Sequence, residues 1–306
     1  MALAPMANVT DAAFRRVIAK YGKPSVMFTE FTSCDGLQSR GREKLLVDLM
    51  YSEIERPMVA QIFGSTPENF TKTAALILEM GFDGIDINMG CPDRNVEKQG
   101  GGAALIKNPE AAKDIIAATR KSAGGLPISV KTRLGYNRNE IETWIPELLE
   151  TGLAAITIHG RTRKEMSKVP AHWDLIGRVA EIAKGSGTLI LGNGDVETCE
   201  DARVKCKEYG VDGVMIGRGV FGNPWLFSDR IDVTLNERLS ILVEHTTLFE
   251  ELLGSHKSFD IMKKHYKAYV TGFDGAKELR VSLMACSTAG EVAQIVKEFC
   301  PEVKGF

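Results

Sequence analysis

Eight short apolar segments, spaced through the first three quarters of the chain, constrain its fold more than any other feature. They lie at Ala2–Pro5, Ser25–Glu30, Met58–Phe63, Gly84–Asn88, Pro127–Arg133, Ala154–Gly160, Thr188–Gly194 and Gly213–Gly219. Amphipathic helical patterns separate them, for example Pro67–Met80, Pro109–Lys121, Asn139–Glu150 and Cys199–Tyr209. Eight strands alternating with helices over about 225 residues predict an α/β fold of the (β/α)8 TIM-barrel type. A doubly wound sheet is the alternative, and the count of eight strands disfavours it.

The alternation stops near Asn236, so we expect a barrel over residues 1–235 and a small all-helical domain over 236–306. Helical patterns in this second part lie at Leu239–Leu253, Ile261–Tyr269 and Val292–Phe299. Residues 257–280 carry six lysines and arginines against three acidic residues, with Tyr266 and Tyr269 among them. A basic face with aromatic residues can hold a nucleic-acid backbone, although most charged stretches are simply solvated.

The bulk composition excludes several classes of protein. A net charge of −2 argues against a non-specific polyanion binder, while leaving room for a local basic patch. The six cysteines form no CxxC pair, and a chain of 306 residues needs no disulfide staples, so we expect reduced thiols. No apolar run approaches the roughly 20 residues of a membrane span, and no signal-peptide pattern is visible. These features predict a cytoplasmic protein that contacts no membrane.

The C-terminal ends of the strands carry polar residues, and in a barrel the chemistry sits at those ends. Nearly every strand ends in residues able to bind a polar ligand: Pro5, Met6, Glu30, Gln61, Asn88, Cys91, Lys131, Arg133, His159, Arg161, Arg163, Asn193, Gly194, Asp195, Gly217 and Arg218. Each has an ordinary explanation alone, such as a snorkelling lysine or a satisfied core histidine. Their occurrence at corresponding places predicts a functional ring.

The last two strand ends predict a phosphate site. The segments Gly192–Asp195 and Gly217–Gly219 close strands seven and eight, where barrels commonly bind phosphate. Glycine lets the backbone approach the ligand, and Arg218 supplies a charged fork. A pair of tight turns, with Arg218 bound to a carboxylate, is the alternative.

A thiol at the exit of strand four is the main candidate for catalysis. The strand Gly84–Asn88 delivers Asn88 and Cys91 to its C-terminal end, and Pro92 stops it. Three consecutive glycines follow at 100–102, before an apolar helical run that starts at Ala103. A buried structural cysteine is the competing interpretation.

Six motifs, in order along the chain, resemble the tRNA-dihydrouridine synthases. They are Ala4–Asp11, Asn88–Pro92, Val130–Arg133, His159–Arg163, Gly192–Asp195, and Gly217–Gly219 with Gly222–Trp225. The similarity continues more loosely into the helical part, at Lys264-His265 and Gly275-Ala276 with Leu279-Arg280. The resemblance implies an FMN-dependent oxidoreductase, a flavoprotein that reduces the C5=C6 bond of a uridine in tRNA with NADPH, or NADH, as the reductant. It further implies a monomer without a metal.

The resemblance also implies roles for single residues. Around the flavin it places Pro5, Met6, Ala7, Gln61, Lys131, His159, Asn193, Gly194, Asp195, Gly217 and Arg218. Cys91 is implied to be the proton donor to C5, which suits a thiol with an ordinary pKa of about 8.5. The implied substrate contacts are Asn88, Arg133, Arg161 and Arg163.

Three residues depart from the family pattern. Asn8 stands where the family generally has glycine beside the flavin, Ser167 where tyrosine is common, and His172 where aspartate is common. The chain also begins almost on strand one, without the usual preceding residues, as a truncated start would.

Two other functions fit part of the pattern. One is an FMN barrel acting on a free small molecule, like a dihydropyrimidine or dihydroorotate dehydrogenase, which needs no basic RNA-facing domain. The other is a tRNA-binding protein that has lost catalysis. The presence of Cys91, Lys131 and Arg218 argues against that loss.

Overall fold

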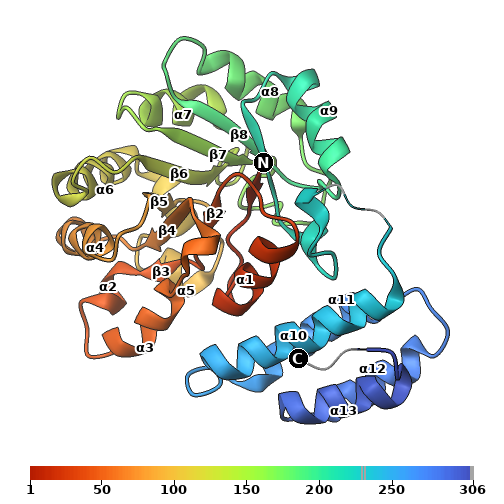
Figure 1. Cartoon of the computed structure of the whole chain (residues 1–306). Coiled ribbons are helices and arrows are strands. Elements are labelled where there is room, and N and C mark those ends of the chain that lie inside the picture. Colours follow the sequence, from red (N-terminus) through yellow and green to blue (C-terminus); the bar gives the residue numbers. More distant parts are fainter. Residues whose placement is uncertain (229, 231, 304–306) are drawn as a thin grey trace.

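The computed structural model describes residues 1–228, 230 and 232–303. Its parallel strands form one curved sheet in the order β1-β9-β8-β7-β6-β5-β4-β2, with β3 also paired to β4 (Figure 1). A parallel bridge between Ala2 and Val26 joins the two ends of this order and completes the barrel. The strand bounds are β1 Ala2–Leu3, β2 Met27–Phe28, β3 Thr32–Ser33, β4 Met58–Phe63, β5 Gly84–Asn88, β6 Ile128–Arg133, β7 Ala155–His159, β8 Leu189–Asn193 and β9 Gly213–Ile216.

Helices surround the barrel and then form a separate group after it. The barrel helices are α1 Ala12–Tyr21, α2 Cys34–Leu37, α3 Arg42–Leu46, α4 Pro67–Glu79, α5 Arg94–Lys98, α6 Pro109–Ser122, α7 Ile141–Leu149, α8 Trp173–Ile182 and α9 Cys199–Tyr209. The helical group consists of α10 Leu235–Leu253, α11 Lys263–Tyr269, α12 Ala276–Ala285 and α13 Ala289–Phe299. Short 3-10 turns lie at Val47–Leu49, Glu53–Glu55, Gly102–Lys107, Arg218–Val220, Leu226–Ser228 and Phe259–Met262.

The barrel predicted from the eight apolar segments is confirmed, and the doubly wound alternative is wrong. The segments Met58–Phe63 and Gly84–Asn88 are strands with the predicted bounds, and the other segments contain shorter strands. The sequence pattern missed the two-residue strand β3, which pairs with β4 at Thr32–Ile62 and Ser33–Phe63. A two-residue strand has too few positions to show a periodicity.

Local sequence signals explain where the barrel helices begin. Pro67 and Pro109 occupy the first turns of α4 and α6, where a missing N–H costs no hydrogen bond. The side chain of Asn108 caps α6 by accepting from the backbone N–H of Ala111. The helical run expected from Ala103 is a 3-10 helix over Gly102–Lys107, and it starts at Gly102, which has a φ of +59°.

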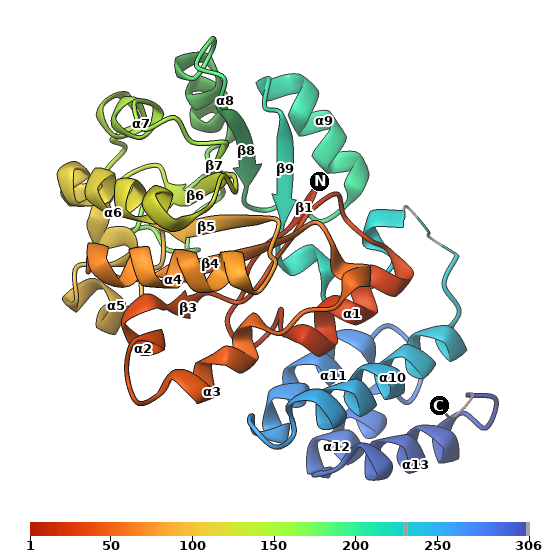
Figure 2. The ribbon, with the colours of Figure 1, turned by 60° about the vertical axis from the view of Figure 1, so that its left-hand side comes forward.

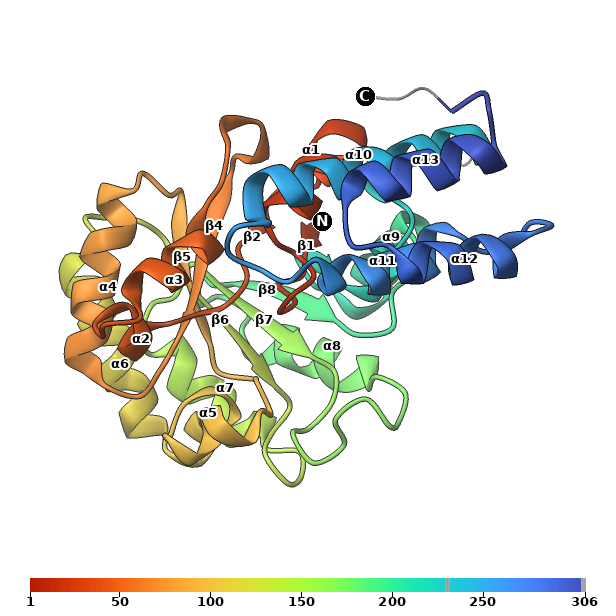
Figure 3. The same ribbon diagram turned by 90° about the horizontal axis from the view of Figure 1, so that it is seen from below.

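The helical group has its own apolar core, which continues into the barrel through α1. Leu242, Phe249 and Tyr269 are fully buried in that core, together with Ala13 and Val17 of α1. Helix α1 packs directly against α10 (Figure 2). Figure 3 shows α10–α13 gathered beside the barrel. The helical group therefore rests on the first helix after β1.

The predicted basic face of the helical group is wrong in its aromatic part. Tyr266 and Tyr269 are fully buried, so neither ring is available to stack on a base. They point inward because Met262, His265, Tyr266 and Tyr269 recur at the spacing of one helical face.

Among residues 1–228, 230 and 232–303, no helix is long and apolar enough to cross a membrane.

Candidate active site

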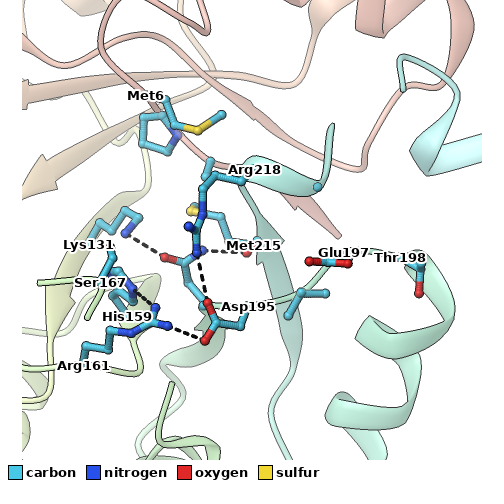
Figure 4. A pocket seen from close by; sticks show the side chains of 17 residues that line it. Met6, Lys131, His159, Arg161, Ser167, Asp195, Glu197, Thr198, Met215 and Arg218 are labelled. Atoms are coloured by element: carbon cyan, nitrogen blue, oxygen red, sulfur yellow. Dashed lines mark hydrogen bonds and ion pairs between the residues drawn. The ribbon is translucent and has the colours of Figure 1, made fainter. Parts of the chain in front are cut away.

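A cavity of about 780 Å³ opens at the C-terminal ends of the barrel strands (Figure 4). Its walls come from the loop after β1 and from the ends of β6, β7, β8 and β9. The lining residues are Ala4, Pro5, Met6, Lys131, His159, Arg161, Ser167, Asn193, Gly194, Asp195, Val196, Glu197, Thr198, Met215, Gly217, Arg218 and Gly219. Its volume lies within the range of about 300–1,000 Å³ typical of cofactor and ligand sites.

Asp195 organises the charged part of this cavity. One carboxylate oxygen accepts from Arg161, and from the backbone N–H of Ala171 at 2.9 Å. The other oxygen accepts from Nη2 of Arg218 at 3.1 Å, as Figure 4 shows. The bond from Arg161 is the first cause that holds the pKa of Asp195 below its usual range. Arg218 is 70% exposed and keeps most of its guanidinium available for an anionic ligand.

His159 is neutral in this site. Burial first, and then the charges of Lys131, Arg133, Arg161 and Arg218, lower its pKa to about 2. Nη1 of Arg161 lies 3.1 Å from Nε2 of His159. Because a guanidinium only donates, Nε2 accepts this bond and the imidazole proton is on Nδ1.

Lys131 contributes a second cation to the wall of the cavity. Its Nζ donates to Oδ1 of Asn193 at 3.1 Å, and the amide of Asn193 donates in turn to Met215 O at 2.8 Å. Burial first, and then the nearby charge of Arg133, lower the pKa of Lys131 to about 8. The ammonium therefore remains the major form at neutral pH.

The loop after β1 forms the wall opposite Asp195. Met6 lines the cavity, and its backbone N–H donates to Oγ1 of Thr10 at 2.9 Å. Asn8, at the turn of this loop, has a φ of +54°, a backbone conformation that glycine adopts without strain. Asparagine is one of the few other residues that tolerate this conformation.

Gly217 contributes open space rather than a side chain. A Cβ placed there would lie 3.6 Å from Ala4 Cβ and from Met6 Sδ, both of them in the cavity wall. A side chain at this position would narrow the cavity where Arg218 begins. The open volume, the exposed guanidinium and the ammonium of Lys131 together fit a large anionic cofactor.

Beneath the rim, Gln61, Asp86 and Asn88 form a buried hydrogen-bond chain. Nε2 of Gln61 donates to Oδ2 of Asp86 at 2.6 Å, and Oε1 of Gln61 accepts from Nδ2 of Asn88 at 3.1 Å. Oδ1 of Asp86 accepts from Oγ of Ser129 at 2.5 Å. Burial is the largest influence on Asp86 and raises its pKa to about 6.

The side-chain oxygen of Asn88 shapes the turn that carries Cys91. Oδ1 accepts from the backbone N–H groups of Gly90 at 3.1 Å and Cys91 at 2.9 Å. Both ends of the Asn88 amide are thus engaged by the protein. This short-range turn is typical of asparagine at a strand end.

Cys91 is partly buried at the exit of β5, and Gly102 packs against it. A Cβ at Gly102 would lie 2.7 Å from Cys91 O and 2.9 Å from a methyl of Val96. Burial is the main cause that raises the pKa of the Cys91 thiol, so it holds its proton at neutral pH. The structure therefore presents Cys91 as a thiol rather than a thiolate, which suits a proton donor.

Arg133 and Arg163 are both bound to protein groups. Nε of Arg133 donates to Gly90 O at 2.7 Å, and its Nη1 donates to Thr162 O and Met166 O at 3.2 Å each. Arg163 forms a bidentate pair with Glu97. The two arginines tie the β5, β6 and β7 loops together around Cys91.

The structure brings most of the predicted cofactor residues to one cavity. Nine of them line it: Pro5, Met6, Lys131, His159, Asn193, Gly194, Asp195, Gly217 and Arg218. Arg161, predicted as a substrate contact, lines it as well. Ala7, Gln61, Asn88, Cys91, Arg133 and Arg163 lie outside the lining set.

Sequence reasoning did not assign a role to several other residues of the wall, namely Ala4, Ser167, Val196, Glu197, Thr198 and Met215. A signal for some of them was present. Val196, Glu197 and Thr198 directly follow the Gly192–Asp195 motif, and Thr198 caps α9 by accepting from Asp201 N. Extending that motif to the next helix start would have included them.

The chain matches the family model described as "Dihydrouridine synthase (Dus)" over residues 2–304. A "Probable tRNA-dihydrouridine synthase" of Staphylococcus aureus (strain MRSA252) is 43% identical over 303 residues, covering 97% of this chain and 92% of the relative. The "Probable tRNA-dihydrouridine synthase 2" of Bacillus subtilis (strain 168) is 41% identical, covering 97% of this chain and 93% of the relative.

Solved structures with much lower sequence identity share the barrel. Histamine dehydrogenase from Rhizobium sp. 4-9 superimposes with a TM-score of 0.55 at 12% identity, over 83% of this chain and 48% of that one. Morphinone reductase in complex with tetrahydroNAD gives a TM-score of 0.51 at 12% identity, over 74% of this chain and 84% of that one. At such identities the likeness concerns the fold alone.

Proposed function

This chain belongs to the dihydrouridine synthase family, and on that premise we propose that it reduces the C5=C6 bond of uridines in tRNA with FMN as its cofactor and NADPH as the reductant. Family membership implies a flavin, and the finer choice of FMN is supported by the cavity. Its single exposed arginine and its glycine-bounded strand ends suit one terminal phosphate. We further propose that the protein acts as a cytoplasmic monomer without a metal.

The observation that carries this proposal is the cavity between Met6, Lys131 and Asp195. Arg218 and the glycine-rich ends of β8 and β9 would hold the phosphate, and neutral His159 and Asn193 would hold the sugar-like chain. Lys131 would place its positive charge beside the polar edge of the ring system. Pro5, Met6 and Ala7 would face the ring through backbone groups. Gln61 would reach the edge of the ring only by giving up its hydrogen bond to Asp86 or to Asn88.

The reaction adds a hydride to C6 and a proton to C5 of the uracil ring. When bound, the flavin supplies the hydride. Cys91 gives the proton from Sγ to C5, where negative charge develops as C6 is reduced. Burial keeps this thiol protonated until the step requires it, because burial raises its pKa.

The surroundings of Cys91 hold the donor in place. Asn88 fixes the backbone N–H of Cys91, and Gly102 lets the following loop pack onto it. Asn88, Arg133, Arg161 and Arg163 remain proposed contacts to the flipped uridine or its flanking phosphates. Each already has a protein partner, so contact with RNA requires exchange or sharing of that partner.

The small-molecule dehydrogenase alternative is overturned by the family match, which extends through the helical group to residue 304. The proposal is tested by incubating the purified protein with FMN, NADPH and unmodified tRNA transcript, followed by mass spectrometry of the digested nucleosides. We expect dihydrouridine in the complete reaction, none when NADPH is omitted, and none from the flavin-free apoprotein until FMN is added. A wild-type protein that binds no flavin and forms no dihydrouridine would overturn the proposal.

A further inference from the structure

A buried ion cluster joins the helical group to the rim of the barrel. Lys257, in the connection after α10, places Nζ 2.6 Å from Oε2 of Glu30 and 2.7 Å from Oδ1 of Asp48. The side chains of Lys257 and Glu30 are only 12% and 5% exposed. Lys257 is thus a partner of the barrel rather than a free cation on an RNA-facing surface.

The same glutamate holds the loop that forms one wall of the cofactor cavity. The second carboxylate oxygen of Glu30 accepts from the backbone N–H of Asn8. The carbonyl of Asn8 accepts from Nζ of Lys264 in α11 at 2.7 Å. Both backbone groups of Asn8, a residue with a positive φ, are therefore held by charged side chains. The helical group supplies one of these side chains, Lys264, and its Lys257 is paired with the other, Glu30.

Movement of Asn8 would pass directly to Met6. The backbone oxygen of Met6 accepts from the N–H groups of Val9 at 3.1 Å and Thr10 at 3.0 Å, which closes the turn around Asn8. Met6 and Pro5 line the cavity at the other end of this turn. A short closed turn moves as a unit, so its anchor at Asn8 fixes the wall at Met6.

We propose that the helical group is a structural part of the cofactor site, with Lys257 acting through Glu30, and Lys264 acting directly, as positioning residues for the Asn8 turn. The inference rests on the flavin of the proposed function. It assigns to two lysines of the basic segment a task in cofactor binding that sequence reasoning had given to RNA. Weakening the contacts between the helical group and the Asn8 turn should therefore lower the affinity for the flavin.

The test compares FMN affinity of the full-length apoprotein in matched variants. Lys257→Met removes the charge and keeps the aliphatic length, and we expect FMN to bind about tenfold more weakly, as measured by quenching of flavin fluorescence. Lys264→Met provides a second variant at an exposed site, where we expect folding to be retained and FMN affinity to fall about threefold.

Two controls remove other contacts of the helical group. Glu244→Gln weakens another polar link between the helical group and the barrel, where Glu244 accepts from Lys20 at 2.7 Å and from the hydroxyl of Tyr21. Lys263→Met lies in the same basic segment but pairs with Asp260 of its own domain. Both should retain FMN affinity within about twofold of wild type, at a temperature where circular dichroism shows every variant folded.

A selective loss in the two test variants, restored in Lys257→Arg, supports the inference. An equal loss in Glu244→Gln overturns it, because general loosening of the domains then explains the effect. Unchanged affinity in Lys257→Met also overturns it.

Hydrogen exchange of the apoprotein gives a readout that needs no flavin. Faster exchange at Val9 and Thr10 in Lys257→Met is expected, and unchanged exchange there contradicts the inference. If wild type binds no FMN, the proposed cofactor fails, while hydrogen exchange still decides whether Lys257 anchors the turn.

Discussion

The two sides of the barrel mouth use similar residue types in different ways. On one side, which we call the cofactor side, Lys131 of β6 lines an open cavity together with Asp195 after β8 and Arg218 after β9. On the side of β5, which we call the substrate side, Asn88, Arg133 and Arg163 give their polar groups to other parts of the protein. The cofactor side is therefore ready for a ligand, whereas the substrate side is a scaffold that presents Cys91.

The largest effect should come from removing the thiol that this scaffold presents. In Cys91→Ala, formation of dihydrouridine from tRNA should fall by about 10²–10⁴, the usual loss for a positioned general acid. Cys91→Ser should be impaired as well, because a hydroxyl is a much weaker acid than a thiol. Steady-state nucleoside analysis measures both, and FMN content should stay at the wild-type level. Full activity in Cys91→Ala would return Cys91 to a structural role.

Arg133 tests whether the substrate side is a scaffold, because in that case the arginine contributes to the unfolding free energy of the protein. Arg133→Met leaves the carbonyls of Gly90, Thr162 and Met166 without their donor, and we expect the unfolding free energy to fall by about 3 kcal/mol. Arg163→Met removes a bidentate pair with Glu97, whose side chain is only 9% exposed, and should cost less than Arg133→Met, about 1–2 kcal/mol. Urea denaturation of the apoproteins compares the two. Equal costs would contradict a special structural role for Arg133.

The sequence predicted the barrel well, because buried parallel strands appear as continuous apolar runs. Gly84–Asn88 shows this directly, since its glycine boundary and isoleucines define the observed strand. Strand order also placed the polar strand ends at one rim, which explains why nine predicted cofactor residues share one cavity.

Side-chain partners could not be predicted in the same way. Arg163 binds Glu97, 66 positions away, and Lys257 binds Glu30, 227 positions away, so only the folded chain brings them together. Charge alone suggested RNA contacts for Lys257 and Lys264, and tertiary structure gives them barrel partners instead. The inward position of Tyr266 was available from helical spacing and was outweighed by its basic neighbours.

The pH dependence of the unfolding free energy tests whether His159 is neutral in the folded protein. Its pKa is about 2 in the folded protein, against an ordinary value of 6.5 for an exposed histidine, so the unfolded chain binds more protons between these values. Neutral His159 therefore makes its full contribution to the unfolding free energy above pH 6.5. This contribution falls as the pH is lowered, and by about pH 5 the unfolding free energy has dropped by about 2 kcal/mol. His159→Gln should remove this part of the acid sensitivity in urea denaturation of the apoprotein. An unchanged pH dependence in His159→Gln would show that the imidazole is already charged in the fold.

The smallest effect should come from the exposed guanidinium of the cofactor side. Arg218→Ala should weaken FMN binding by about 1.5 kcal/mol, the low end for a charge-assisted hydrogen bond, because the side chain is 70% exposed. The unfolding free energy of the apoprotein should change little, since Asp195 keeps its bond from Arg161. Fluorescence titration with FMN, and with riboflavin as the phosphate-free control, measures the effect. A similar loss for riboflavin would contradict a phosphate contact.

Stopped-flow absorbance of the flavin in Cys91→Ala tests the central claim that the cofactor side is complete without the substrate side. Reduction by NADPH depends on the cofactor side, so its rate should stay near wild type. In the proposed mechanism, reoxidation by unmodified tRNA takes its proton from Cys91, so it should slow by about 10²–10⁴. Rapid reoxidation by tRNA, or a loss of equal size in both half-reactions, would contradict this division between the two sides of the barrel mouth.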